Sequence, residues 1–425
     1  MSKIINQTRI NEFGEINGNG RIFVNPRTAT ITDLSDIKIL HCGVDTVRQM
    51  YKGRVNPEVL TLFQEPNILE FAGYTWHACR VGRDSGYQYK LQNSDLGLIL
   101  LIKNFNQHQA DIGSHLKIEV SPHFLLANDA EKVQHTLDSL ADKVLDDWSH
   151  NYCAVHVALD VQGWEPSADI VQRMNCRSQK IVDMSGISSF EFNATASVYG
   201  RGESYLFGSP TACQLSIYNK TIQAKATDKL DYWESVWGLQ TTDLLVKVYD
   251  DSASVWRIEL RYHHNVIKQF AQGSIDVSTG EVINPMSYLS LAPHLDGILK
   301  YGFEQFKLLS KEHKNVLSAD WCLFSSDPKV NTGLFSLIDE TEYKRYYKSA
   351  SGFSGKNIEL FLGNFVSIIA REKVGATKAF EALKQWDCWA VIVEFFEEKG
   401  KTERDIYRWI RDKLTERVVR WGVAV

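Results

Sequence analysis

The chain has 425 residues, 44% hydrophobic and 23% charged, which is typical of a globular protein with two or three domains. The formal net charge of −5 excludes a global positive field that attracts nucleic acid, so any such binding depends on local patches. The longest apolar run, LGLILLI at 96–102, is too short to span a membrane, and the polar N-terminus lacks a secretion signal. We therefore expect a cytoplasmic protein with no membrane partner. Seven scattered cysteines without a CxxC pair indicate reduced thiols.

The first half of the chain predicts strands, a helix and a further strand. Residues 1–35 are polar and rich in Asn, Gly and Thr, which predicts a loosely held N-terminal arm. Apolar or alternating segments predict strands at 37–46, 96–102 and 115–121. A helix is expected from about Asn128 to His150, capped by Asn128 or Asp129, followed by an alternating strand at 152–161 and a short helix at 165–174.

The second half repeats this order before it becomes helical. A glycine-containing hairpin is predicted at 196–209, and LSIYNK at 215–220 is predicted to be a strand. VWRIELRYH at 255–263 alternates, and a helix begins directly after it. The turn-rich segment 278–287 indicates a domain edge. The order of strand then helix occurs at both LKIEV and WRIELR, which suggests a β-α unit used twice.

These elements predict an α+β fold. We expect a central sheet rich in antiparallel strands, helices packed on one face, and a helical C-terminal region. The predicted organisation is an N-terminal arm at 1–35, a sheet domain at 36–300 and a helical domain at 301–425 that serves DNA binding, dimerisation or contact with a helicase.

The alternating strands carry acids and an imidazole on their polar faces. Glu119 lies on the strand at 115–121, His156 and Asp160 on that at 152–161, and Glu259 on that at 255–263. Neighbouring strands are ~4.8 Å apart, so Glu119, Asp160 and Glu259 are expected to meet around one cation. Such donors suit Mg²⁺ or Mn²⁺. His156 and Asp160 are roughly 13 Å apart along a strand, so one binds the ion and the other orients a ligand or DNA.

Tyr218 and Lys220 share the polar face of LSIYNK with Ser216. A lone tyrosine, glutamate or histidine on a strand face is usually solvated or hydrogen-bonded, and only the combination points to a site. Beside a cation, a phenolate can attack a phosphodiester and keep the bond as a phosphotyrosine. Lys220 would then steady the phosphate or lower the pKa of Tyr218.

Several short segments, in this order, resemble the Rep_trans family of rolling-circle replication initiators of plasmids and phages and related conjugative-element relaxases. These segments are LKIEVSP at 116–122, HVALD at 156–160, YLFG at 205–208, SIYNK at 216–220 and WRIE at 256–259. The resemblance covers roughly residues 38–300 and implies a HUH-like catalytic core. Ser216 stands where the family usually has an arginine, and His156 stands where it has an aspartate.

The resemblance implies a tyrosine-dependent, metal-assisted DNA endonuclease and strand transferase. Tyr218 would take the 5′-phosphate of one strand at a double-stranded origin, with Lys220 beside it. The metal would be held among Glu119, His156, Asp160 and Glu259, and the neighbouring Arg257 and Arg261 are expected to contact DNA. The implied partners are origin DNA with a hairpin-forming inverted repeat, the nicked single strand, a UvrD/PcrA-like helicase and a second copy of the chain.

The C-terminal helix and the choice of function leave alternatives open. From residue 401 onward there are seven Lys and Arg against four acids, and a helix would place Arg404, Arg408 and Arg411 near one face. These arginines either grip DNA phosphates or belong to a solvated helix with ion pairs. A conjugative relaxase and a non-catalytic origin-binding protein are the alternatives to a replication initiator. A metal phosphodiesterase would not need Tyr218.

Overall fold

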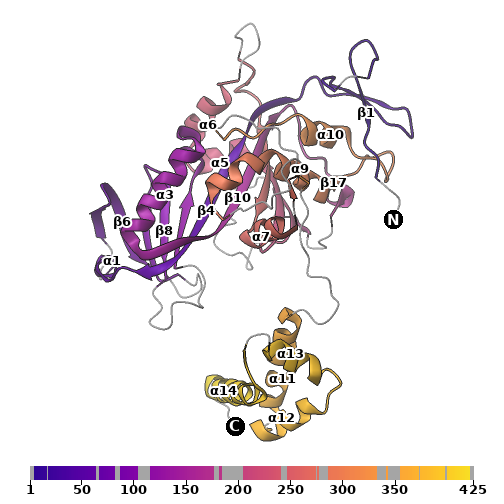
Figure 1. The fold of residues 1–425 in the computed structure, drawn as a ribbon. Helices are drawn as coiled ribbons and strands as arrows, with labels where there is room; N and C mark the ends of the chain where they lie inside the picture. The colour runs from indigo at the N-terminus through magenta and orange to yellow at the C-terminus, as the bar shows by residue number, and fades with distance from the viewer. Residues whose placement is uncertain are drawn as a thin grey trace. The chain divides into compact units, whose positions relative to one another are not determined.

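The computed structural model describes the chain in fourteen segments that form two compact units. The described residues are 4–16, 18–63, 67–81, 87–103, 115–176, 181–183, 204–240, 247–273, 275–276, 286–332, 341–342, 355–372, 374–397 and 400–421. The units are residues 1–346 and 347–425 (Figure 1). Within the described residues, no helix has both the length and the apolar character needed to cross a membrane.

A large antiparallel sheet forms the first unit. In the part of the chain that the structure describes, its strand order is β12-β13-β14-β15-β10-β4-β9-β8-β7-β6-β5, and every neighbouring pair is antiparallel. The strands are β4 (Lys38–Val55), β5 (Asn67–Phe71), β6 (Tyr74–Arg80), β7 (Tyr89–Asn93), β8 (Leu98–Ile102), β9 (Leu116–Val120), β10 (Leu145–Gln162), β12 (Ile181–Asp183), β13 (Ser204–Gly208), β14 (Cys213–Asn219) and β15 (Val255–Tyr262). The α+β class with an antiparallel sheet and a helical C-terminal region is thus confirmed.

The sheet is built on both sides of its two long central strands, β4 and β10. Strand β4 pairs with β9, which is flanked by β8, and strand β10 pairs with β15, which is flanked by β14. Helices α2 (Pro122–Ala127) and α3 (Ala130–Val144) follow β9, and helix α7 (His264–Gly273) follows β15. This topology has the two strand-then-helix units that the sequence predicts.

The apolar face of the sheet is covered by helices. On α3, Leu137 and Leu140 pack in the same core as Val155 and Val157 of β10. Burial of each such side chain stabilises the fold by about 1.5–3 kcal/mol. On β15, the Tyr262 hydroxyl donates to a main-chain carbonyl of α9 at 2.6 Å. Other helices that contribute to this core include α8 (Tyr288–Leu291), η2 (Ala292–His294), α9 (Leu295–Gln305) and α10 (Ala319–Ser326).

Helices also cover part of the opposite face, contrary to the expectation of one covered face. Helices α5 (Lys220–Ala226) and α6 (Leu230–Trp237) form a second small core in which Trp233 and Trp237 pack against Leu40 of β4. Leu40 reaches this face because the ladder shifts register between Asp160 and Val161. The remaining helices of the unit are α1 (Pro57–Thr61) and α4 (Ile170–Arg173).

The N-terminal segment is an ordered small sheet, not the loosely held arm predicted. It comprises β1 (Thr8–Ile10), β2 (Ile22–Val24) and β3 (Ile31–Asp33). Arg9 donates two hydrogen bonds to the Asp327 carboxylate, at 2.5 and 2.8 Å, which ties β1 to the end of α10. Two short ladders join β11 (Met174–Asn175) to β17 (Lys307–Leu308) and β16 (Ile275–Asp276) to β18 (Thr341–Glu342).

Two predicted helices are shorter in the structure. Asp129 caps α3 as expected, because its carboxylate accepts from the Lys132 amide at 2.7 Å. The helix ends at Val144, since Leu145 takes an extended conformation and starts β10 in the ladder with β4. Of the helix predicted at 165–174, only Ile170–Arg173 is helical. The predicted hairpin residues 196–203 and the turn residues 278–285 lie outside the described part.

The boundary between the units is not at residue 300. Helices α9 and α10 belong to the core of the first unit because their apolar faces pack under the sheet. The second unit consists of α11 (Gly355–Arg371), α12 (Ala376–Lys384), α13 (Trp389–Glu397) and α14 (Glu403–Trp421). Its separate core includes Ile406, Ile410 and Leu414 of α14, which repeat every four residues along one face.

Candidate active site

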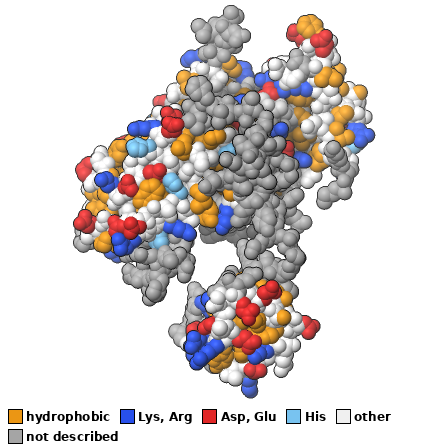
Figure 2. All heavy atoms as spheres, viewed as in Figure 1, with side chains coloured by type: hydrophobic (Ala, Val, Ile, Leu, Met, Phe, Trp, Pro, Cys, Tyr) orange, Lys and Arg blue, Asp and Glu red, His pale blue; other side chains and the backbone are white. Residues whose placement is uncertain are grey.

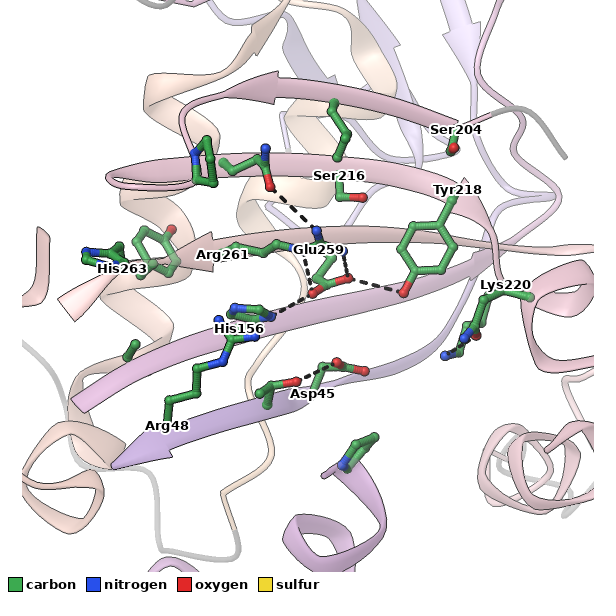
Figure 3. Close-up of a pocket in the computed structure, with 18 of the residues that line it drawn as sticks. Asp45, Arg48, His156, Ser204, Ser216, Tyr218, Lys220, Glu259, Arg261 and His263 are labelled. Atoms are coloured by element: carbon green, nitrogen blue, oxygen red, sulfur yellow. Dashed lines mark hydrogen bonds and ion pairs between the residues drawn. The ribbon is translucent and has the colours of Figure 1, made fainter. Parts of the chain in front are cut away.

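A polar pocket of about 590 Å³ opens on the part of the sheet that α5 and α6 border. Its lining comes mainly from β4, β10, β13, β14, β15 and α5 (Figure 3). Ala154, on the floor at β10, has only a methyl side chain, which leaves room above the strand. The pocket thus lies on the face where the sequence predicts acids, an imidazole and a tyrosine.

A β-bulge brings Asp45 into this pocket. His156 of β10 pairs with Thr46 of β4, but the next residue, Val157, pairs with Val44, so Asp45 has no partner in the ladder. An extra residue of this kind re-aims its side chain. Val44 consequently turns into the core, where it is 3% exposed, and Asp45 joins Thr46 among the pocket residues.

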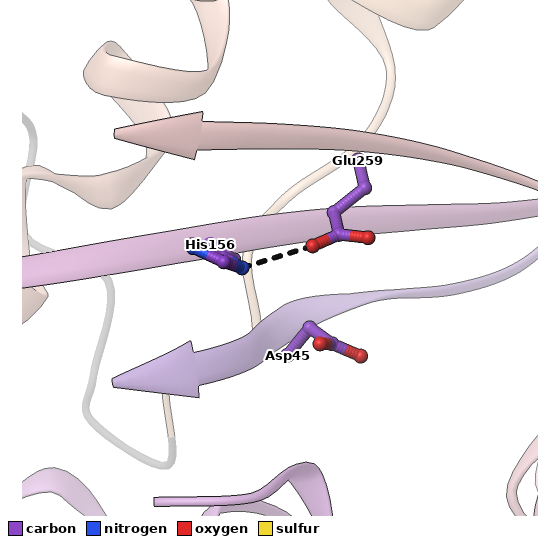
Figure 4. A group of neighbouring side chains, drawn as sticks. All are labelled: Asp45, His156 and Glu259. Atoms are coloured by element: carbon purple, nitrogen blue, oxygen red, sulfur yellow. Dashed lines mark hydrogen bonds and ion pairs between the residues drawn. The ribbon is translucent and has the colours of Figure 1, made fainter. Parts of the chain in front are cut away.

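Asp45, His156 and Glu259 form a compact group of potential metal ligands. One donor atom from each lies within 4.8 Å of the others (Figure 4). His156 Nδ1 is 3.0 Å from Glu259 Oε1. Because an ionised carboxylate can only accept, Nδ1–H donates this bond.

Arginine side chains bind both carboxylates of the group. Arg261 donates to the two oxygens of Glu259 at 2.9 and 3.0 Å. Burial by itself would raise the pKa of Glu259, but Arg261 and the hydrogen bond from His156 hold this pKa well below its ordinary value. Arg257 donates to Asp45, which also accepts from the Thr46 hydroxyl at 3.0 Å.

The phenol of Tyr218 points at the same group. Its hydroxyl donates to Glu259 Oε2 at 3.1 Å (Figure 3). Burial and the charge of Glu259 raise the pKa of Tyr218 well above its ordinary value, and Arg257 opposes them. The hydroxyl is therefore neutral until further positive charge enters the pocket.

The donor set fits a hard divalent cation. Burial lowers the pKa of His156, which favours the neutral imidazole that metals bind. Two carboxylates and this imidazole offer the oxygen-rich set that suits Mg²⁺ or Mn²⁺. Of the four ligands predicted from sequence, His156 and Glu259 lie in this group.

Lys220 lies at the edge of the pocket, one residue beyond the end of β14. Its ammonium donates to Gln223 at 2.7 Å and lies 4.3 Å from the centre of the Trp233 ring. Burial and the nearby Arg257 lower the pKa of Lys220 to about 7. Lys220 therefore changes charge near neutral pH, and Arg257 and Arg261 are the cations that act most strongly on Tyr218.

Comparison with known proteins finds a relative from a phage. The uncharacterized protein ORF430 of Pseudomonas phage Pf1 is 52% identical to this chain over 410 residues, covering 96% of this chain and 95% of its own length. The chain belongs to the family of this phage protein. No family model matches the chain, and no solved structure matches it. The matched length exceeds the first unit, so the similarity extends into the second.

Asp160 is not among the grouped donors, contrary to the sequence prediction. It is fully buried and accepts from Arg257 at 2.6 and 2.8 Å and from the Trp237 indole at 2.9 Å. All the room around its carboxylate is taken by these donors. Arg257 is itself fully buried between Asp160 and Asp45, so the expectation that it contacts DNA is wrong.

Glu119 also lies apart from the donor group. Its carboxylate is bound by Lys117 at 2.7 Å and by Arg48 at 3.2 Å. The register explains the separation, because β4 lies between β9 and β10 and Glu119 pairs with Arg48. The sequence predicts that Glu119, Asp160 and Glu259 lie together. In the structure, Asp45, His156 and Glu259 lie together instead.

The basic residues predicted to contact DNA have different surroundings. Arg261 is about one-quarter exposed and faces the pocket. Arg408 and Arg411 of α14 are half-exposed and pair with Asp405 and Asp412, and Arg404 is exposed on the same helix. Figure 2 shows basic and acidic side chains intermixed on this unit, which fits the solvated-helix alternative. DNA binding by α14 stays a prediction.

Sequence reasoning missed Asp45 and Arg48. The signal for Asp45 is the order Val44-Asp45-Thr46-Val47, in which two polar residues stand together and break the period of two expected in a strand. After this break, Arg48 is the next residue on the polar face of the strand. Asp45 is the next-to-last residue of the strand predicted at 37–46, and Arg48 lies beyond the end of that prediction. In the structure, β4 continues to Val55.

Proposed function

We propose that this protein is a replication initiator that nicks one strand of a double-stranded origin through a 5′-phosphotyrosine on Tyr218. The HUH-like, Rep_trans-type catalytic core is part of this proposal. The observation that carries it is the hydrogen bond from Tyr218 to Glu259, which is also a member of the grouped donors. A nucleophile, a cation site and a pocket bordered by basic side chains are the parts that such a reaction requires.

The reaction exchanges one phosphodiester bond for another. The Tyr218 oxygen bonds to phosphorus, the bond from phosphorus to the 3′ oxygen breaks, and the 3′ oxygen takes up a proton. Glu259 orients the phenol by accepting its hydrogen bond, the phenolic proton is lost to solvent, and the proton that the 3′ oxygen gains comes from solvent. Held by Asp45, His156 and Glu259, a Mg²⁺ or Mn²⁺ ion would supply the positive charge that favours the phenolate and offsets the charge of the phosphate.

Other residues of the pocket support this chemistry. Arg261 neutralises Glu259 while it faces the pocket, so it is placed to meet a phosphate as well. Lys220, with its pKa of about 7, gains a proton when an anion approaches and adds to the positive charge. Ser216, where the family usually has an arginine, lines the pocket together with Tyr218.

The phage relative is compatible with this proposal. ORF430 is a protein of a phage, and phages replicate their own genomes. A conjugative relaxase would use the same residues on a different origin.

The test is formation of a covalent adduct on supercoiled DNA from the replicon that encodes the chain, with Mg²⁺ or Mn²⁺. We expect nicked DNA with protein bound to its 5′ end, and complete loss of this adduct in Tyr218→Phe. Tyr205→Phe is the matched control, because Tyr205 lies on the adjacent strand β13 and is buried in the core. Its adduct should match that of the wild type.

Three outcomes would contradict the proposal. DNA binding without any adduct indicates the non-catalytic origin-binding protein. Cleavage without a covalent species, unaffected by Tyr218→Phe, indicates a metal phosphodiesterase. An adduct that survives in Tyr218→Phe shows that another residue is the nucleophile.

A further inference from the structure

Arg48 and Lys117 project together onto one rim of the pocket, from the neighbouring strands β4 and β9. Both line the pocket and both bind the carboxylate of Glu119, Lys117 at 2.7 Å and Arg48 at 3.2 Å. The three side chains are 20–27% exposed, so solutes can reach them. The ammonium of Lys117 also lies 5.0 Å from the centre of the Tyr87 ring, which positions it.

Positive charge accumulates on this rim. Besides burial, the groups that lower the pKa of His263 are Arg48 and Lys117. The pKa of His264 is lowered to about 4 by burial and then by His263, Lys268 and Lys117. Such mutual effects mean that an anion on the rim would relieve repulsion among these groups. Glu119 already offers one negative charge to two of them.

The rim lies close to His156 of the donor group. Arg48 pairs across the ladder with Ala154, which is two residues before His156 on the same face of β10. At ~3.4 Å per residue this offset is about 7 Å. An extended single strand that has its scissile phosphate at Tyr218 and passes over His156 therefore carries a flanking phosphate to this rim, above the methyl group of Ala154.

We propose that Arg48 and Lys117 form a binding subsite for a phosphate that flanks the scissile one, and that Glu119 occupies this subsite when DNA is absent. The nature of the ligand, single-stranded DNA, rests on the proposed function. A phosphodiester accepts from a guanidinium and an ammonium in the same way as a carboxylate does. Glu119 must therefore give up its two partners when the strand binds, and it lowers the affinity by competing for them.

This role for Glu119 is opposite to that of a metal ligand. As a ligand, Glu119 would strengthen the site, and its loss would weaken metal binding and activity. As a competitor, its conversion to a neutral side chain strengthens DNA binding and leaves metal binding unchanged. Whether Glu119→Gln strengthens or weakens DNA binding therefore distinguishes the two roles.

The experiment measures fluorescence anisotropy of a labelled single-stranded oligonucleotide with Tyr218→Phe protein, which cannot form an adduct. In this background we expect Glu119→Gln to tighten binding about three- to tenfold. Glu131→Gln is the matched control, because Glu131 is an exposed acid on α3, the helix on the opposite face of the sheet. It should leave the affinity within about twofold.

A second variant tests the cations. Lys117→Met keeps the apolar stem against Tyr87 and removes the charge, so it should weaken binding and reduce the salt dependence by one contact, ~0.7 in slope for a single strand. Equal affinities of Glu119→Gln and its parent, or an unchanged slope in Lys117→Met, would overturn the subsite. These readouts need no cleavage. Absence of an adduct in otherwise wild-type protein would refute the nickase and leave the binding result standing.

Discussion

Replacing Arg257 by methionine removes the buried guanidinium that joins Asp160 to Asp45. Three hydrogen bonds disappear, two of them to Asp160 at 2.6 and 2.8 Å. Asp160 is 0% exposed, and in the variant the Trp237 indole remains as a donor to it. Breaking one side of a buried ion pair typically costs about 3–5 kcal/mol. We expect a loss of this size in the free energy of unfolding of the first unit.

The loss should depend on pH in a defined direction. In the wild type, burial raises and Arg257 lowers the pKa of Asp160, and the net shift is downward, so its stabilisation is present above about pH 4 and is lost below it. Without Arg257, burial raises this pKa above the unfolded value, and stability falls as the pH rises through that window. The deficit of the variant is therefore larger at about pH 7.5 than at about pH 5.

Urea denaturation followed by tryptophan fluorescence measures this deficit. Arg54→Met is the matched control, because its partner Asp146 and Arg54 itself are 39% and 56% exposed, and such a pair is worth about 0–1 kcal/mol. Adding Asp160→Asn to Arg257→Met should recover a large part of the loss. A deficit below about 1 kcal/mol, or one that Asp160→Asn does not change, would refute the assignment of a buried ion pair.

Three further predictions follow from the pocket and the second unit. Asp45→Asn should weaken Mn²⁺ binding about tenfold or more by calorimetry, whereas Glu119→Gln should not, and equal effects would contradict the donor group. Lys220→Met should stabilise the protein most below about pH 7 and should lose this advantage as the pH rises to about 10.5. The reason is that, between these pH values, Lys220 binds fewer protons in the folded protein than in the unfolded chain. A pH-independent effect on the urea midpoint would contradict this prediction. A fragment of residues 347–425 should melt cooperatively with helical circular dichroism because it has its own core, and a featureless spectrum would show that it depends on the first unit.

The strands were predictable because their signal is local. In β15, Ile258 and Leu260 alternate with Glu259 and Arg261, and the structure places these pairs on opposite faces. The end of α3 was not predictable in this way. Leu145 and Trp148 continue the helical stripe, yet pairing of β10 with Val55 and its neighbours on β4 overrides that periodicity.

The site was predicted in part, and the errors have one cause. Facing direction follows from alternation, so Tyr218, His156 and Glu259 were assigned to a common face. The order of strands across a sheet does not follow from alternation, and β4 separates Glu119 from His156. Partner choice is equally non-local, because only the folded ladder places Arg257 opposite Asp160.

Because Asp45 is an extra residue in β4, the affinity for a cation depends on whether this one residue is present. Deleting Asp45 would let Val44 and Thr46 follow each other in an unbroken ladder, with Val44 still in the core and Thr46 still facing the pocket. The sheet would keep its packing and lose an oxygen donor. Among descendants of this chain, loss or gain of a single codon at this point would therefore switch the metal site off or on while the fold endures.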